Sequence, residues 1–212
     1  MKLDILSDPI CPWCYIGKTH LDRALAERDG NPFDIEWHPF QLNYDMPREG
    51  IDRQQYLEAK FGGRDGVVKA YTPVFEAAEA AGLEIAWDKI TRTPNTLDAH
   101  RMIHWAGLEG VQDAAVVAMF DAYFHRGEDI GRADVLAEVA NRAGMDQEVV
   151  ARLLAGDQDL ELITERDAHA RQRGVTGVPT FIVGNHHAVV GAQPVELWRR
   201  VLDDLEAQAR EG

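Results

Sequence analysis

The sequence predicts an α/β protein in which a small sheet is interrupted by a long helical insertion. Three patterns lead to this expectation: an opening strand–helix–strand, a helical block from about residue 52 to residue 174, and a closing strand–strand–helix. The two ends of the chain together complete one small sheet unit. We therefore expect a sheet domain formed by residues 1–44 and 175–212, with residues 45–174 as an inserted helical domain.

The opening segment reads as a parallel strand pair joined by a helix. Residues 2–7 (KLDILS) are an apolar run typical of a short buried strand, and residues 33–42 (FDIEWHPFQL) are a second. Between them, apolar residues recur at helical spacing after Pro12, which suits a first helical turn because no backbone N–H is required there. Such a unit predicts a right-handed crossover.

The middle of the chain shows helical periodicity almost throughout. Stripes of Ala, Val and Leu recur at spacings of three and four residues, which is typical of helices that bury one face. Asp146 is placed to cap one of these helices, and Asp157 is placed to cap the next.

Strand patterns return near the end of the chain. Residues 179–183 (PTFIV) and 187–190 (HAVV) are the two runs, and Gly184-Asn185 between them predicts a two-residue hairpin turn. From about residue 194 to residue 210, apolar residues fall on one face of a closing helix.

Composition excludes several classes of protein. The chain has 212 residues, with 22 Lys and Arg against 36 Asp and Glu, and a formal net charge of −14. This charge repels nucleic acid and anionic membranes, so neither is expected as a partner. No apolar run approaches the ~20 residues of a transmembrane helix, and the first residues lack the apolar stretch of a secretory signal. We expect a cytoplasmic protein, in which structural disulfides are rare.

Both cysteines of the chain lie in one four-residue window, Cys11-Pro12-Trp13-Cys14. A C-x-x-C pair near a βαβ pattern in a cytosolic protein points to a thioredoxin-like redox motif. Backbone N–H groups at the start of the helix can point at the sulfur of Cys11 and stabilise its thiolate. Cys14 lies inside the helix and should be more buried. We expect Cys11 to be the nucleophile and Cys14 the resolving thiol.

Other interpretations of the pair are weaker. Tetrahedral zinc needs two more ligands, and His20 lies too far along the same helix to close such a site easily. Two inert buried cysteines would rarely show this spacing. His100 and His104 are four residues apart on an expected helix, but no third ligand aligns with them, so no metal site is expected.

A proton relay for Cys14 could come from the second expected strand. Glu36 and His38 alternate onto the same face of that strand, and either side chain could exchange a proton with the resolving thiol. The sequence does not tell whether that face meets the helix that carries Cys14.

Beyond the cysteine window, several further segments carry a resemblance to a known family. They run in order along nearly the whole chain: SDPICPWCYIGK (7–18), WHPFQLN (37–43), NTLDAHRM (95–102), AYFHRGEDIG (122–131), GVTGVPTFIV (174–183) and GAQP (191–194). The chain resembles the DsbA family of thiol-disulfide oxidoreductases, and its FrnE-like branch in particular. The resemblance implies a thioredoxin-like fold with a large all-helical insertion. It also implies that Cys11, Cys14 and Pro179 are nucleophile, resolving thiol and cis-proline.

The same resemblance implies where substrate binds. In thioredoxin-like folds the residue before the cis-proline offers its backbone groups to the substrate, which here is Val178. Residues beside the motif and at matching positions of the cleft complete the expected substrate-binding set: Pro12, Trp13, Phe40, Gln41 and Asn95.

The expected activity is thiol-disulfide exchange through the CPWC motif, with no metal or organic cofactor because the cysteine pair is itself the redox group. The expected partners are protein or small-molecule thiols and disulfides, with glutathione as a candidate co-substrate, and the chain is expected to be a monomer or homodimer. The best-known DsbA proteins are secreted oxidants with His between the cysteines, whereas this chain has Pro12-Trp13, so the resemblance leaves the direction of the reaction open.

Two alternatives to this activity stay open. The neighbouring kappa-class glutathione transferases and 2-hydroxychromene-2-carboxylate isomerases share the inserted fold, and they typically carry Ser where this chain has Cys11. A glutathione-dependent isomerase or transferase is therefore one alternative. A peptide-binding or chaperone module that uses the inserted helices is the other.

Overall fold

The structure confirms the expected α/β architecture. It is a computed structural model that describes the backbone of residues 1–211 and the side chains of residues 1–208. The elements follow in this order: β1 (Lys2–Ser7), α1 (Pro12–Ala26), β2 (Asp34–Pro39), β3 (Ile51–Asp52), α2 (Arg53–Phe61), α3 (Arg64–Ala80), β4 (Arg92–Thr93), α4 (Leu97–Leu108), α5 (Gln112–Phe120), the π-helical turn η1 (Asp121–His125), α6 (Ala133–Arg142), α7 (Gln147–Leu154), α8 (Leu160–Gln172), β5 (Thr180–Val183), β6 (His187–Val190) and α9 (Val195–Glu211).

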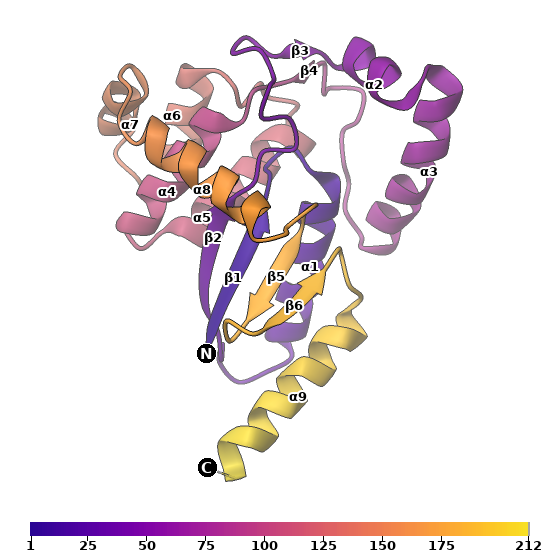
Figure 1. Ribbon diagram of the computed structural model, residues 1–212, viewed down its shortest axis with the longest axis vertical. Coiled ribbons are helices and arrows are strands. Elements are labelled where there is room, and N and C mark those ends of the chain that lie inside the picture. The colour runs from indigo at the N-terminus through magenta and orange to yellow at the C-terminus, as the bar shows by residue number, and fades with distance from the viewer. Residues whose placement is uncertain (212) are drawn as a thin grey trace.

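One four-stranded sheet, in the order β2-β1-β5-β6, is built from both ends of the chain (Figure 1). The central strand β1 runs parallel to β2, with Leu3 opposite Ile35. On its other side it runs antiparallel to β5, with Leu3 opposite Val183. Leu3 and Ile5 are fully buried, which explains why this segment reads as a buried strand.

The two faces of the sheet are covered differently (Figure 1). Helices α1 and α9 pack on one face, where the fully buried Trp198 of α9 meets Phe181 of β5 edge-on at a centroid distance of 4.8 Å. On the other face, α8 packs beside β2, and a small cluster of Leu6, Phe40 and Ala170 fills the contact. The helix covers only part of this second face, so a hollow is left beside it.

The helical segment between β2 and β5 divides into two parts in Figure 1. Helices α4–α8 lie together on one side of the molecule, and the buried Phe120 of α5 and Phe124 of η1 stack on Tyr15 of α1, at centroid distances of 4.9 and 5.5 Å. Helices α2 and α3 form a hairpin on the other side, and α3 contacts α1. In residues 1–211 there is no helix with the length and apolar character that crossing a bilayer requires.

The helix ends test the expected caps. Asp146 caps α7 as expected, because its carboxylate accepts hydrogen bonds from two backbone N–H groups of the first turn, at 2.9 and 3.0 Å. The expectation for Asp157 is wrong, since α8 starts after Asp159. The carboxylate of Asp159 does not bond to the helix start and instead accepts from the indole N–H of Trp105, at 2.8 Å.

The connection between β5 and β6 also differs from the expectation. Val183 is paired with His187, so three residues form the turn rather than two. Gly184 and Asn185 both have left-handed backbone conformations, with φ of 59° and 65°. His186 completes the turn, and its N–H bonds back to the carbonyl of Val183 at 3.2 Å. The Gly-Asn pair marks the turn correctly but does not fix its length.

A fully buried arginine ties the insertion together. The guanidinium of Arg101 on α4 donates to the carbonyls of Leu153 at 2.9 Å, Gly156 at 2.7 Å and Gln158 at 2.7 Å. It also pairs with Asp98 at 2.7 Å. Arg101 therefore supplies the donor for the carbonyls of Gly156 and Gln158 in the loop after α7, and a second donor for the carbonyl of Leu153, which also accepts from the N–H of Gly156 at 3.3 Å.

We expect Arg101→Met to lower the free energy of unfolding by about 3–5 kcal/mol, because it removes the nearest cation from Asp98 and leaves the carbonyls of Gly156 and Gln158 without their donor. For a domain of this size the melting temperature should fall by roughly 10 °C. Arg132→Met is the matched control, since its pair with Asp134 is exposed and should matter by less than about 1 kcal/mol. Equal effects of the two substitutions in urea unfolding would contradict this role of Arg101.

Candidate active site

The CPWC motif lies where the chain passes from β1 into α1. Cys11 is the N-cap of α1 and has an extended backbone, and Pro12 occupies the first helical position. The carbonyl of Cys11 accepts from the N–H of Cys14 at 3.0 Å, which closes the first turn. No side chain caps this helix start, so its remaining N–H groups and the positive end of the helix dipole are available to the Cys11 sulfur.

The two cysteines are close together and differ in environment. They are not joined by a disulfide, and their exposed fractions are 3% for Cys11 and 1% for Cys14. Burial raises the pKa of the Cys14 thiol, and the adjacent Cys11 sulfur raises it further, against hydrogen bonds to Ser7 and to the backbone of Asp8. Cys14 thus keeps its proton and can donate it toward the sulfur of Cys11.

The loop before β5 forms the opposite wall of this site. The Val178-Pro179 peptide bond is cis, and the carbonyl of Val178 lies 3.7 Å from the Cys11 sulfur, as acceptor of its S–H when that thiol is protonated. Gly17, one turn beyond Cys14, allows this close approach. A Cβ at Gly17 would lie 3.1 Å from Cγ of Pro179, which is tighter than an ordinary contact.

Asp8, which the sequence-based expectations miss, is a fully buried carboxylate in the turn before Cys11. Its two oxygens accept from the N–H groups of Ile10 at 3.3 Å and Leu42 at 2.7 Å, so it shapes the turn and ties it to the chain beyond β2. Burial raises its pKa from 3.8 to about 7, although these bonds and one from Thr96 oppose the rise. The sequence offered one signal for a role of Asp8, namely that an acidic residue stands between an apolar strand and the cysteine motif.

His100 of α4 faces Asp8 inside the protein. Its Nε2 lies 4.0 Å from Oδ1 of Asp8 and has no hydrogen-bond partner. The distance allows an ion pair, but burial lowers the pKa of His100 from 6.5 to about 4 and raises that of Asp8. Between these two values both groups are neutral, so the pair is uncharged rather than ionic.

Tyr71, on α3, brings the helical insertion close to the motif. Burial raises the pKa of its phenol, with a smaller contribution from the charge of Cys11 and an opposing one from Arg53. Arg53 donates to the hydroxyls of Tyr71 and Tyr123, both at 3.1 Å, so the guanidinium is held by two phenols. The sequence patterns did not predict this contact of Arg53 with two tyrosines, because the three residues come from α2, α3 and η1.

The structure brings part of the expected substrate-binding set to the cysteines. Pro12 and Trp13 belong to the motif itself, and Trp13 is half-buried and packs against the buried cluster that includes Ile16 of α1 and Ala78 of α3. Val178 is half-buried beside Cys11, as the hydrogen bond to its carbonyl shows.

The other expected contacts are engaged within the chain. Phe40 is buried against Leu6 on the sheet face opposite α1, with the guanidinium of Arg171 4.0 Å from its ring centroid. Gln41 is also buried, and its N–H bonds to Asp167 at 2.6 Å. The side-chain oxygen of Asn95 accepts from Leu97, and its amide nitrogen donates to the carbonyl of Met46. Both polar atoms of the Asn95 side chain are thus engaged within the chain.

Glu36 and His38 do not reach the cysteines. His38 lies on the sheet face away from α1, and its Nε2 is 2.7 Å from Oδ1 of Asp4. Together with Asp4 they form the one His/acid group among residues 1–208 with metal-ligand spacing. The ammonium of Lys2 lies 3.1 Å from Asp4 and 3.0 Å from Glu36, so a side-chain cation already pairs with both carboxylates of this group.

A pair of free thiols at the start of a helix, on a four-stranded sheet that carries a helical insertion, is the arrangement of a thioredoxin-like domain. The chain belongs to the family of DSBA-like thioredoxin domains, whose model matches residues 2–203. A probable DsbA oxidoreductase from Streptomyces coelicolor is 30% identical, with a TM-score of 0.83 over 96% of this chain and 89% of that one. The uncharacterized protein YwbO of Bacillus subtilis (strain 168) is 25% identical over 205 residues, 96% of each chain.

Two more distant structures have the same fold. The cytosolic disulfide reductase DsbM from Pseudomonas aeruginosa, in a structure with glutathione, is 20% identical, with a TM-score of 0.69 over 99% of this chain and 100% of that one. A 2-hydroxychromene-2-carboxylate isomerase is 18% identical, with a TM-score of 0.73 over 100% and 98%. The same architecture thus serves a reductase and an isomerase, and the fold by itself does not distinguish them.

The buried His100 predicts a specific pH dependence. A histidine whose pKa is depressed by folding contributes stability above pH 6.5 and loses it as the pH falls toward 4. When the pH is lowered from 7.5 to 5, the unmodified protein should therefore lose on the order of 2 kcal/mol of its free energy of unfolding through His100. His100→Gln should not show this loss, so its stability relative to the unmodified protein should rise by the same amount. Urea unfolding at each pH measures this, with the exposed His187→Gln as control. Parallel pH profiles for all three proteins would show that His100 does not titrate differently on unfolding.

Proposed function

We propose that this protein is a thiol-disulfide oxidoreductase that works through its CPWC motif, with Cys11 as nucleophile and Cys14 as resolving thiol. One observation carries the proposal: Cys11 lies at an uncapped helix start, while the buried Cys14 beside it has a raised pKa and keeps its proton. The helix end and the Cys14 thiol both favour negative charge on the Cys11 sulfur.

The reaction then follows in two exchanges. The thiolate of Cys11 attacks one sulfur of a substrate disulfide, a Cys11–substrate disulfide forms, and the other substrate sulfur leaves as a thiolate. Cys14 loses its proton and attacks the sulfur of Cys11, which releases the second substrate thiolate and leaves a Cys11–Cys14 disulfide. Two electrons pass from the cysteine pair to the substrate, and the reverse sequence oxidises a dithiol. The cysteines themselves are the redox group, and no metal or organic cofactor takes part.

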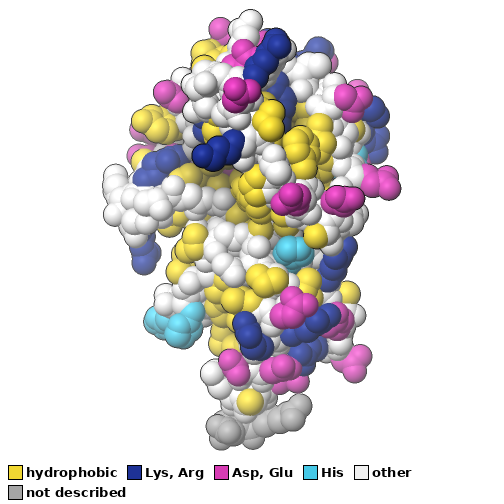
Figure 2. Space-filling model, turned by 90° about the vertical axis from the view of Figure 1, so that its right-hand side faces the viewer, with side chains coloured by type: hydrophobic (Ala, Val, Ile, Leu, Met, Phe, Trp, Pro, Cys, Tyr) yellow, Lys and Arg dark blue, Asp and Glu magenta, His cyan; other side chains and the backbone are white. Residues whose placement is uncertain are grey.

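Substrate binding is proposed to use Val178 and an apolar surface beside Trp13. The backbone of Val178 is next to the Cys11 sulfur, where an extended substrate segment would pair with it. On the face seen in Figure 2, hydrophobic side chains gather where α3 meets the sheet-bearing part of the molecule. A hollow there is lined by Phe75, Leu83 and Trp87 among others, and Leu83 and Trp13 both pack against one buried cluster of Ile16, Ala78 and Ala81. An apolar surface next to the motif suits substrates that carry apolar groups beside their disulfide.

We propose glutathione as a thiol partner of the cysteine pair in the cytoplasm. The shared fold with a cytosolic disulfide reductase whose structure holds glutathione supports this partner. The 3% exposed fraction of Cys11 favours small disulfides or extended segments over disulfides embedded in a folded surface. A glutathione-dependent isomerase is the second candidate, because the isomerase fold covers the whole chain. The presence of both cysteines favours redox exchange, since isomerisation needs no second thiol.

Replacement of the nucleophile tests the assignment directly. Cys11→Ser should reduce the rate of disulfide reduction, measured with insulin or glutathione disulfide, by at least about a thousandfold, because a hydroxyl is not ionised at neutral pH. The circular dichroism spectrum and melting curve should remain those of a folded protein. Full activity in this variant would refute the role of Cys11.

Replacement of the resolving thiol should trap the intermediate. After exposure to glutathione disulfide, Cys14→Ala should carry one glutathione per chain on Cys11, because no second thiol displaces it. Intact-protein mass spectrometry measures the adduct, and the double variant Cys11→Ser/Cys14→Ala is the control that should carry none. If Cys14→Ala forms no adduct, the two-step exchange is wrong. If the variant keeps full turnover on an aromatic substrate with glutathione, the isomerase candidate is favoured.

A further inference from the structure

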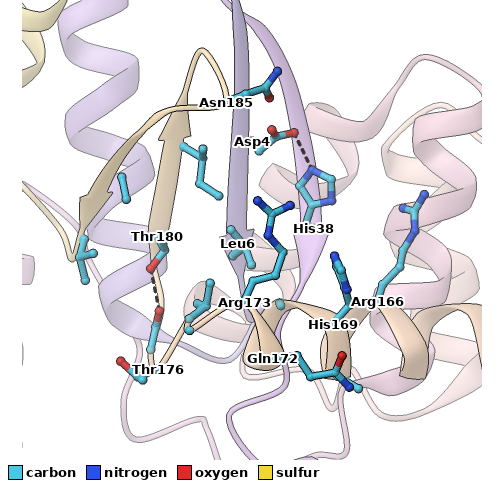
Figure 3. Close-up of a pocket in the computed structure, with 18 of the residues that line it drawn as sticks. Asp4, Leu6, His38, Arg166, His169, Gln172, Arg173, Thr176, Thr180 and Asn185 are labelled. Carbon is cyan, nitrogen blue, oxygen red and sulfur yellow. Dashed lines mark hydrogen bonds and ion pairs between the residues drawn. The ribbon is translucent and has the colours of Figure 1, made fainter.

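A second cavity lies on the face of the sheet opposite α1. It has a volume of about 970 Å³ and is bounded by all four strands of the main sheet, by α8 and by the segment that joins α8 to β5. Figure 3 shows side chains from these separate elements around one hollow. Cys11 and Cys14 do not line it, because they belong to the core on the α1 side of the sheet. The cavity is therefore distinct from the proposed redox site.

Basic side chains converge on this cavity. Arg166, His169 and Arg173 come from α8 and its C-terminal end, and His38 comes from β2 (Figure 3). Arg173 forms no ion pair with any carboxylate among residues 1–208. The nearest carboxylate oxygen to Arg166 belongs to Glu36 and is 4.0 Å away, the limit of an ion pair. The guanidinium of Arg173 is thus available to a ligand, and that of Arg166 is held only by this long contact with Glu36.

The acidic side chains of the cavity do not cancel this charge. Asp4 is already engaged by the ammonium of Lys2 at 3.1 Å and by Nε2 of His38 at 2.7 Å. Glu165, the other carboxylate of the lining, is exposed on α8. The cavity therefore holds more basic than acidic side chains on a chain whose formal net charge is −14. A local excess of this sign attracts an anion to a protein that repels anions elsewhere.

The rest of the lining is largely apolar. Leu6, Ile182, Ala188 and Val190 project from β1, β5 and β6 onto this face. Val190 is 60% exposed, which is unusual for a valine in a strand and leaves its surface free for contact. Convergent polar groups at one side of an apolar floor are the arrangement of a small-molecule site.

We propose that this cavity binds a small organic anion, with a carboxylate or phosphate group against Arg173 and Arg166 and an apolar body along β5 and β6. Guanidinium groups bind both kinds of oxyanion through paired N–H donors, so the structure defines the shared chemistry of the head group. The apolar floor selects against inorganic anions, because phosphate alone would leave it uncovered. This site is independent of disulfide exchange at Cys11.

Isothermal titration calorimetry with octanoate tests the proposal. Octanoate should bind in a saturable way with one site per chain, octyl phosphate should bind at the same site in competition with it, and neutral octanol and inorganic phosphate should each bind at least about tenfold more weakly. The substitution Arg173→Gln should weaken octanoate binding about tenfold, because a charge-assisted hydrogen bond is lost. Val190→Thr, which keeps the shape of the side chain, should weaken it about threefold.

The control is Arg132→Gln, which removes one charge from an exposed arginine outside the cavity and should bind octanoate like the unmodified protein. Arg173 is exposed, so its substitution should leave the circular dichroism spectrum and melting temperature unchanged. Three results would each overturn the proposal: no saturable binding at millimolar octanoate, equal binding by Arg173→Gln and the unmodified protein, or octanol binding as tightly as octanoate.

Discussion

The antiparallel pairing of β1 with β5 is the contact on which the site depends. It joins Leu3 to Val183 across the centre of the sheet and thereby places the end of the α8–β5 loop over the start of α1. The Cys11 sulfur and the carbonyl of Val178 meet only because of this register. A slip of one residue would turn every side chain of β5 to the other face of the sheet. The thiol and the peptide that faces it are therefore positioned by sheet geometry rather than by a flexible loop.

Burial governs the chemistry around the cysteines. Removal of water raises the pKa of Cys14 and Asp8 and lowers that of His100, and in each case the neutral form gains. Between about pH 4 and pH 7, Asp8 and His100 beneath the motif are thus mainly neutral, while the helix start offers its N–H groups at the surface of this region. The unpaired N–H groups of this helix start point toward the position of the Cys11 side chain.

Local patterns predicted the fold and the place of the cysteine pair at the start of a helix well, because they report local constraints. The apolar run of residues 2–7, the proline after Cys11 and the capping Asp146 each act through their own neighbours in sequence. The approach of His100 to Asp8 could not be predicted, since it depends on how α4 packs against the turn before α1.

The inserted helices set the main limit on sequence-based expectations for the site. Asn95 matches a cleft position by resemblance, yet its amide is used to hold the carbonyl of Met46. No sequence pattern indicated that Arg53 donates to Tyr71 and Tyr123, because these two phenols come from α3 and from η1. The basic cavity beside α8 combines strands from both ends of the chain, so no continuous segment carries its signature. Contacts between segments that are distant in the sequence were therefore the features of the site that only the structure revealed.

The sheet also has a consequence for how the chain acquires its shape during synthesis. Strand β1 and both cysteines leave the ribosome early, whereas β5, which completes the sheet beside them, is made after the whole helical segment. Loop closure over such a distance is entropically costly, and early compaction of the helices shortens the span that must close. Until β5 arrives, the nascent dithiol is uncovered and open to oxidants. The unfinished chain is therefore the form in which this cysteine pair is most vulnerable.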